Sequence, residues 1–151
     1  MTSSQRKFDL ADFPHFFKED VDILLGRSAL FDVASDLRGM LSSFQIGSEI
    51  PGVEDITKDT VYVGLYEDSS DVAQYLEVAG IGLDGALRTP FTPDIVREDT
   101  AIILLHAGRD RHVLVILGDS ENALRDAVSL LGSGEFRDGL VGDSVGVYRT
   151  P

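Results

Sequence analysis

Residues 100–134 read TAIILLHAGRDRHVLVILGDSENALRDAVSLLGSG and carry the clearest structural signal in the chain. Two runs rich in apolar residues, TAIILLHAG (100–108) and RHVLVILGD (111–119), are separated only by a turn around Gly108 and Asp110. A connection this short makes the two strands antiparallel. The segment therefore predicts a β-hairpin at about 100–119.

A helix is predicted directly after this hairpin. Its apolar stripe consists of Leu124, Ala127, Val128 and Leu131, which recur at helical spacing. Asp119 or Ser120 suits the N-cap, and Gly132 or Gly134 suits the C-terminal stop.

Two units of a strand followed by a helix precede the hairpin, and one more strand follows the last helix. Alternation of strands and helices is typical of α/β folds in which the early strands are parallel. Residues 46–59 are predicted to form a loop, and residues 81–99, which show no regular pattern, are expected to be irregular. The units are VDILLG (21–26) with SALFDVASDLRGMLSSF (28–44), TVYVGLYE (60–67) with SSDVAQYLEVAG (69–80), and the last strand in DSVGVYRT (143–150).

The predicted fold class is thus α/β, with the layered order β-α-β-α-β-β-α-β. Because the hairpin is antiparallel, the sheet is expected to be mixed but mostly parallel, with three main helices. We expect residues 21–151 to form a single α/β domain. Residues 1–20 are expected to be an aromatic lead-in segment, which contains four of the eight phenylalanines.

The composition argues against several classes of function. Thirteen Lys and Arg residues face twenty-six Asp and Glu residues, and the net charge of −13 disfavours nucleic acids and anionic membrane surfaces as partners. No cysteine is present, which excludes disulfides, thiolate zinc sites and cysteine nucleophiles. No apolar run reaches 18 residues, so no membrane insertion is expected. The N-terminus shows no signal-peptide pattern, and the compartment stays open, cytoplasmic or extracytoplasmic within a longer protein.

The motif GDSEN (118–122) raises the possibility of a serine nucleophile at Ser120. Such a nucleophile needs an adjacent base, and in hydrolases of the GDS type that base lies near the C-terminus. The last histidine here is His112, so no histidine follows Ser120. A helix N-cap at Ser120, with Glu121 in the first turn, explains the same residues, and we favour this interpretation.

The three histidines indicate no metal site. His15 lies in the aromatic lead-in, whereas His106 and His112 flank the predicted turn and are expected to be neighbours across the hairpin. A zinc site would need a third ligand, which no spacing indicates. We therefore predict no metal and no cofactor.

The order of the segments resembles a known kind of non-catalytic module. The resemblance is to the flavodoxin-like domains of BcsB-type periplasmic subunits of bacterial cellulose synthase, and to related α/β modules of cell-surface proteins. The resemblance implies a scaffold or binding surface and no catalytic residues. Because this sequence shows neither the membrane anchor nor the jelly-roll domain of such subunits, we expect it to correspond to one module at most. The residues that carry it are the lead-in FDLADFP, the units VDILLG with SALFDVASDLRGML, the strand TVYVGLYE, and the hairpin and helix of 101–136.

Three functional hypotheses follow. The first is a non-enzymatic α/β module for protein–protein interaction, self-association or assembly, in a cell-surface or polysaccharide-secretion protein. The second is a small-molecule or carbohydrate-binding domain, with its ligand at the carboxyl ends of the strands. The third is a serine hydrolase that uses Ser120. Partner contacts are assigned to Phe13, Phe16, Phe17, Leu87 and Phe91, and ligand contacts to Tyr66, Glu67 and Asp119.

Overall fold

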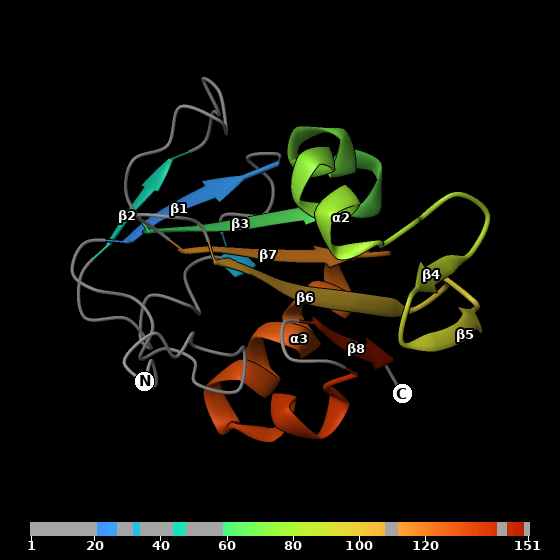
Figure 1. Cartoon of the computed structure of the whole chain (residues 1–151). Helices are drawn as coiled ribbons and strands as arrows, with labels where there is room; N and C mark the ends of the chain where they lie inside the picture. The colour runs from blue at the N-terminus through green and yellow to red at the C-terminus, as the bar shows by residue number, and fades with distance from the viewer. Residues whose placement is uncertain are drawn as a thin grey trace, which may run out of the picture.

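A computed structural model describes residues 21–26, 32–33, 44–47, 59–107, 112–141 and 145–149. These residues form a six-stranded mixed sheet in the order β2-β1-β3-β7-β6-β8 (Figure 1). β1 is parallel to β2 and β3, and β3 is parallel to β7, whereas β6 is antiparallel to both β7 and β8. The mixed α/β prediction is confirmed. The strands are β1 (Val21–Leu25), β2 (Phe44–Gly47), β3 (Asp59–Leu65), β6 (Thr100–Ala107), β7 (His112–Gly118) and β8 (Val145–Arg149).

The β6–β7 hairpin is confirmed at its predicted place. Its pairs run without a break from Ala101 with Gly118 to Ala107 with His112. Because β7 also pairs with β3, the hairpin joins the parallel strands to the antiparallel pair of β6 and β8.

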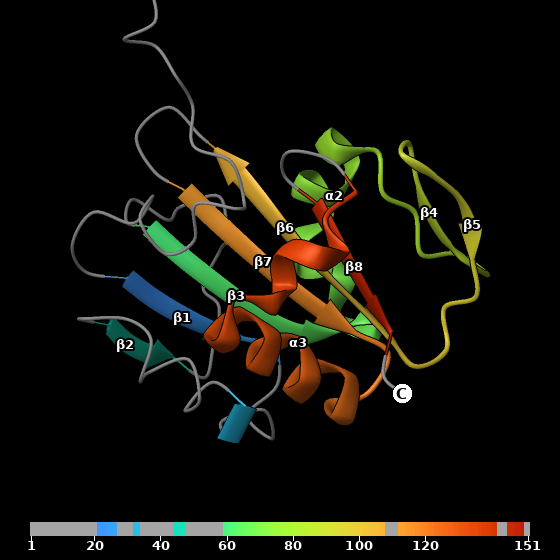
Figure 2. The same cartoon turned by 90° about the horizontal axis from the view of Figure 1, so that it is seen from below.

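Helices cover both faces of the sheet (Figures 1 and 2). A 3₁₀ helix, η5 (Tyr66–Val72), leads into α2 (Ala73–Ala79) on one face. On the opposite face lie α3 (Glu121–Ser133) and a second 3₁₀ helix, η6 (Glu135–Gly139). Burial on both faces explains why the central strands are apolar at nearly every position instead of alternating.

Each face has its own core. Successive side chains of a strand point to opposite faces, so Val61 and Val63 of β3 pack towards α3 while Tyr62 packs towards α2. The α3-side core includes Leu114, Ile116, Leu124, Val128 and Phe136. The α2-side core includes Tyr66, Tyr75, Leu76, Ile102, Leu104 and Val115.

The prediction for residues 69–80 is correct at its end and wrong at its beginning. The predicted helix begins at Ser69, but Ser69 and Ser70 both lie inside η5, which starts directly after β3. The Asp68 carboxylate accepts a hydrogen bond from the Leu65 N–H at 3.1 Å, which fixes this early turn. Gly80 ends α2 in the left-handed conformation, with φ 75°, as a helix-terminating glycine does.

The stretch 81–99 contains a short hairpin that the sequence did not indicate. β4 (Leu87–Thr89) pairs antiparallel with β5 (Thr92–Ile95) and forms a separate two-stranded sheet beside the main one (Figure 1). The Thr89 hydroxyl accepts hydrogen bonds from the Phe91 and Thr92 N–H groups, both at 3.2 Å, which closes the turn. The expectation of irregular structure is therefore wrong for these residues.

The predictions for the N-terminal third are tested only in part. Asp32 and Val33 are helical, as expected for 28–44, but Phe44 begins β2 and is not helical. Ile46 also belongs to β2 and not to a loop. The lead-in of residues 1–20 lies outside the described residues.

Candidate functional site

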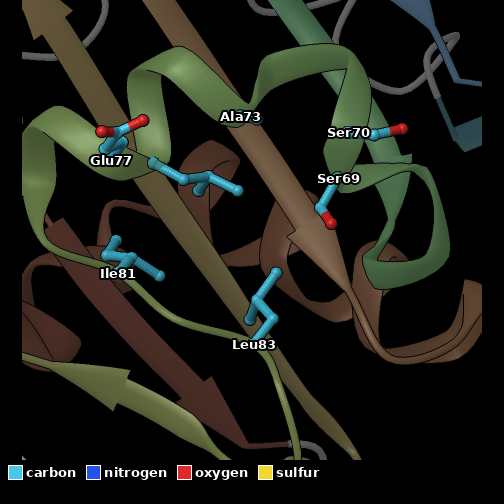
Figure 3. A pocket seen from close by; sticks show the side chains of 7 residues that line it. Ser69, Ser70, Ala73, Glu77, Ile81 and Leu83 are labelled. Atoms are coloured by element: carbon cyan, nitrogen blue, oxygen red, sulfur yellow. The ribbon is translucent and has the colours of Figure 1, made fainter.

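A hollow of about 300 Å³ opens beside α2 (Figure 3). Side chains from η5, from α2 and from the segment that follows α2 line it. Ser69 and Leu83 point towards each other across the hollow, whereas Glu77 lies at the end away from the two serines. The lining residues are Ser69, Ser70, Ala73, Leu76, Glu77, Ile81 and Leu83.

The hollow exists because the chain turns back at Gly80. The left-handed conformation there allows the Ile81 N–H to bond the Leu76 carbonyl at 2.9 Å, which brings residues 81–83 alongside α2. Two backbone hydrogen bonds between Gly82 and Arg88, at 2.8 and 2.9 Å, hold that segment to β4. The Arg97 guanidinium donates to the Leu83 carbonyl. The wall formed by Ile81 and Leu83 is therefore fixed from both sides.

The η5 side of the hollow is anchored to the sheet by Tyr62. This fully buried residue of β3 donates its hydroxyl to Asp71 Oδ2 at 2.7 Å and lies 3.3 Å from the Asp68 carbonyl oxygen. The approach depends on a glycine, because a Cβ at Gly26 would lie 2.6 Å from Tyr62 Oη and 2.8 Å from Asp68 Oδ2. The end of β1 thus packs directly against the turn that carries Ser69 and Ser70.

The chain around the hollow is strongly acidic. The segment 66–87 contains five acidic residues and no lysine, arginine or histidine. Glu77 is exposed at the hollow itself, and Asp84 is exposed just beyond Leu83. The five acidic residues are Glu67, Asp68, Asp71, Glu77 and Asp84.

Of the three predicted ligand-binding residues, Tyr66 and Asp119 form hydrogen bonds within the protein. Tyr66 is 4% exposed, and its hydroxyl shares a hydrogen bond of 2.7 Å with Thr100 Oγ1. Burial raises the pKa of Tyr66 to about 12, and the nearby Asp119 charge acts in the same direction. Asp119 Oδ2 itself accepts the Asp99 N–H at 3.1 Å. Tyr66 and Asp119 are therefore neighbours with internal partners, Glu67 is exposed, and none of the three lines the hollow.

Ser120 caps α3, as the sequence predicts. Its Oγ accepts the Ala123 N–H at 3.3 Å, and α3 starts at the next residue, Glu121. His112 lies at the first residue of β7, and His106 pairs with Val113 beside it. Since Ser120 lies two residues beyond Gly118, where β7 ends, the length of the strand separates it from both histidines by roughly 20 Å. Neither of these two imidazoles is placed to act as its base.

The expected proximity of the two hairpin histidines is wrong for their side chains. His106 contacts Tyr75 on the α2 side, with ring centroids 4.8 Å apart. His112 shares its face with Leu114 and Ile116, which belong to the α3-side core, because side chains alternate along β7. The sheet therefore lies between the two rings. Within the described ranges, no group of three or more histidine, aspartate or glutamate residues is arranged to hold a metal ion.

The predicted partner contacts divide into three groups. Phe91 is 52% exposed at the tip of the β4–β5 hairpin. Leu87 is fully buried in the α2-side core, which corrects its assignment to a contact surface; β4 alternates, and Leu87 is on its inward side. Phe13, Phe16 and Phe17 lie outside the described residues.

Sequence patterns missed two exposed valines. Val78 on α2 is 75% exposed and Val96 after β5 is 66% exposed. The sequence of a seven-residue helix, or of a hairpin that is not recognised, does not indicate whether a single valine is buried.

Of the helices that the structure describes, none is long and apolar enough to cross a membrane.

Comparisons with known proteins give a fold likeness and no family. No family model matches the chain, and no curated protein matches it. A solved structure of the glycoside hydrolase CpGH84D is similar, with a TM-score of 0.54 and 14% sequence identity. The match covers 89% of this chain but only 20% of that one. It shows a shared fold over one domain-sized segment, and the resemblance to BcsB-type modules stays a prediction.

Proposed function

We propose that the chain is a non-enzymatic α/β module that binds a protein partner through one face. That face is formed by α2, the segment 81–83 and the β4–β5 hairpin, and we call it the α2–hairpin face. The observation that carries the proposal is the position of the exposed large apolar side chains. Within the described residues these are Val78 on α2, Phe91 at the hairpin tip and Val96 directly after β5, so two belong to this face and the third adjoins it in the chain. Single exposed valines are common, but an exposed aromatic at a hairpin tip among them is typical of a contact surface.

The parts of this face are held together, which favours a preformed binding surface. A Cβ at Gly80 would lie 3.3 Å from Pro90 Cγ, so the hairpin tip packs on the end of α2. Arg88 and Asp94 form an ion pair of 3.3 Å across the hairpin. A rigid surface loses little conformational entropy when a partner binds.

The proposal retains the finer fold expected from the sequence. A helix before Phe44 would be the third main helix of a layered α/β module. The α2–hairpin face would then be free for contact in a scaffold of a cell-surface or polysaccharide-secretion protein, as the resemblance implies.

Site-specific photocrosslinking tests the proposal directly. p-Benzoyl-L-phenylalanine is placed at Phe91 in the full-length protein within its native host, and at Ser129 on the exposed side of α3 as the control. We expect a discrete protein adduct from position 91 and none from position 129. Absence of an adduct from positions 91, 78 and 96, or the same adducts from position 129, would refute the proposal.

A second candidate function, small-molecule or carbohydrate binding, is favoured by the hollow itself. Its volume of about 300 Å³ is at the lower end of ligand pockets, and two serines and a glutamate accompany an apolar floor. A thermal-shift panel of soluble oligosaccharides and nucleotides checks it. Ligand at about a hundred times its Kd adds about 2.7 kcal/mol to the free energy of unfolding. A shift that Ala73→Gln abolishes would favour this function over protein binding.

A further inference from the structure

We propose that the hollow beside α2 receives a lysine or arginine side chain of the partner. This inference rests on the proposed function, because it names the chemistry that the α2–hairpin face recognises. Its basis is a combination of shape and charge: an apolar floor that leads to an acidic rim.

The floor suits the stem of a long basic side chain. Leu76 and Ile81 are almost fully buried, and Leu83 is half-buried, so the hollow offers packed hydrocarbon at its base. Lysine and arginine pack their methylene stems against such surfaces while the charged head stays in water. A short polar side chain would leave this floor unfilled.

The rim suits the charged head. Glu77 lines the hollow and is exposed, and none of the described side chains forms an ion pair with it. The Ser69 and Ser70 hydroxyls supply further acceptors on the other side. A cationic head would therefore find a carboxylate at one end of the hollow and two hydroxyl groups at the other.

The surrounding charge supports a cation and opposes an anion. The segment 66–87 has a formal charge of −5, from five acidic and no basic residues, within a chain of net charge −13. Two arginines that contact this segment are already engaged, since Arg97 donates to the Leu83 carbonyl and lies 5.6 Å from the centre of the Tyr66 ring, and Arg88 pairs with Asp94. A basic partner segment would be attracted from a distance and held at short range.

Peptide selection on the intact protein tests this inference. A phage library of random dodecapeptides is selected on the full chain, and the strongest peptide is labelled and measured by fluorescence anisotropy. We expect selected peptides to carry a lysine or arginine beside apolar residues. Replacing that residue with norleucine, which keeps the stem but not the charge, should weaken binding about ten-fold.

Variants of the hollow localise the binding. Glu77→Lys turns an attraction into a repulsion and should weaken binding about ten-fold, and Ala73→Gln should weaken it by filling the hollow. Glu135→Lys on η6, beyond the opposite face, changes the net charge equally and should weaken binding less than about two-fold. Ala73, Glu77 and Glu135 are all exposed, so the three variants are expected to fold.

The failures of the two proposals are distinguishable. Selected peptides without basic residues, or binding that resists Glu77→Lys and Ala73→Gln, would overturn the inference. If such peptides lose affinity with Phe91→Ser, the proposed protein-binding function stands without the basic side chain. If no peptide binds and Phe91 yields no crosslinked adduct, both proposals are wrong.

Discussion

Replacing Ser120 with alanine separates a structural serine from a catalytic one. The substitution removes the oxygen that accepts the Ala123 N–H and leaves that donor without its cap. Loss of an N-cap serine costs about 0.5–2 kcal/mol. The bond here is 3.3 Å long and the residue is half-buried, so the lower half of that range applies, about 0.5–1 kcal/mol.

For a chain of 151 residues this loss corresponds to a decrease in Tm of about 1–4 °C. Calorimetry of the wild type, Ser120→Ala and Ser120→Asp measures it. Aspartate keeps an acceptor and adds negative charge at the helix N-terminus, so its Tm should stay at or above that of the wild type.

The same three proteins are assayed with p-nitrophenyl acetate. Because Ser120 is assigned to the cap, hydrolysis by Ser120→Ala should equal that of the wild type. A wild-type turnover that disappears in Ser120→Ala while the Tm is unchanged would refute the cap assignment and restore the serine hydrolase hypothesis.

Three further changes have definite expected outcomes. Tyr62→Phe removes the hydroxyl that donates to Asp71 and should lower the free energy of unfolding, measured in urea, by about 2 kcal/mol. Asp71→Asn keeps an acceptor and should lower it less; equal losses in the two variants would contradict the assigned hydrogen bond. Asp99 has φ 59°, a left-handed conformation, so Asp99→Gly should be at least as stable as the wild type. Asp99→Ala should be about 1 kcal/mol less stable than Asp99→Gly, and the reverse order would contradict the left-handed conformation. The pKa of Tyr66 is raised from 10.0 to about 12, so its contribution to stability is complete below pH 10 and is lost as the pH rises towards 12. Urea unfolding from pH 9 to 12 should show the free energy of unfolding falling by up to about 3 kcal/mol, and that of Tyr66→Phe should fall less steeply.

The sequence predicts those parts of the fold in which local signals agree with the tertiary structure. In the β6–β7 hairpin and α3, the apolar runs, the short turn, the cap at Ser120 and the stop at Gly134 all indicate the same structure. Gly134 has φ 86°, which a helix-terminating glycine adopts without strain. Each of these signals is local, so one sequence is sufficient to read them.

The β4–β5 hairpin is missed because its order comes from elsewhere. Its strands have three and four residues, and Pro93 cannot donate to a ladder. What fixes the hairpin is the burial of Leu87 against the α2-side core and the packing of Pro90 on Gly80. These contacts join distant segments, and propensity within the hairpin does not reveal them.

The helix prediction across 28–44 fails at Phe44 for a related reason. Phe44 continues the helical spacing of the preceding apolar residues, yet it pairs with Val21 at the start of β2. A periodic pattern gives no signal for where a strand partner becomes available, and tertiary pairing overrides it.

The candidate site is predictable at the level of region but not of residues. The rule that ligands lie at the carboxyl ends of parallel strands leads to the turn after β3, where η5 begins. Within that turn the rule selects Tyr66 and Glu67, whereas the hollow uses Ser69 and Ser70. The difference arises because Tyr66, at the start of η5, points inwards to Thr100, and the serines that line the hollow come three and four residues later.

The anchoring of η5 connects the stability of the sheet to the shape of the proposed binding surface. Tyr62 bonds Asp71, and β1 approaches this contact so closely that a Cβ at Gly26 would clash with the Tyr62 hydroxyl. Ser69 and Ser70 lie between the two contacts of this hydroxyl in sequence, at Asp68 and Asp71. The rim of the hollow is therefore held by a fully buried side chain of the central sheet, and the opposite wall by the Gly82–Arg88 ladder. A surface supported from two independent elements keeps its shape before a partner arrives, which is the property that a binding module needs and that an ordinary loop lacks.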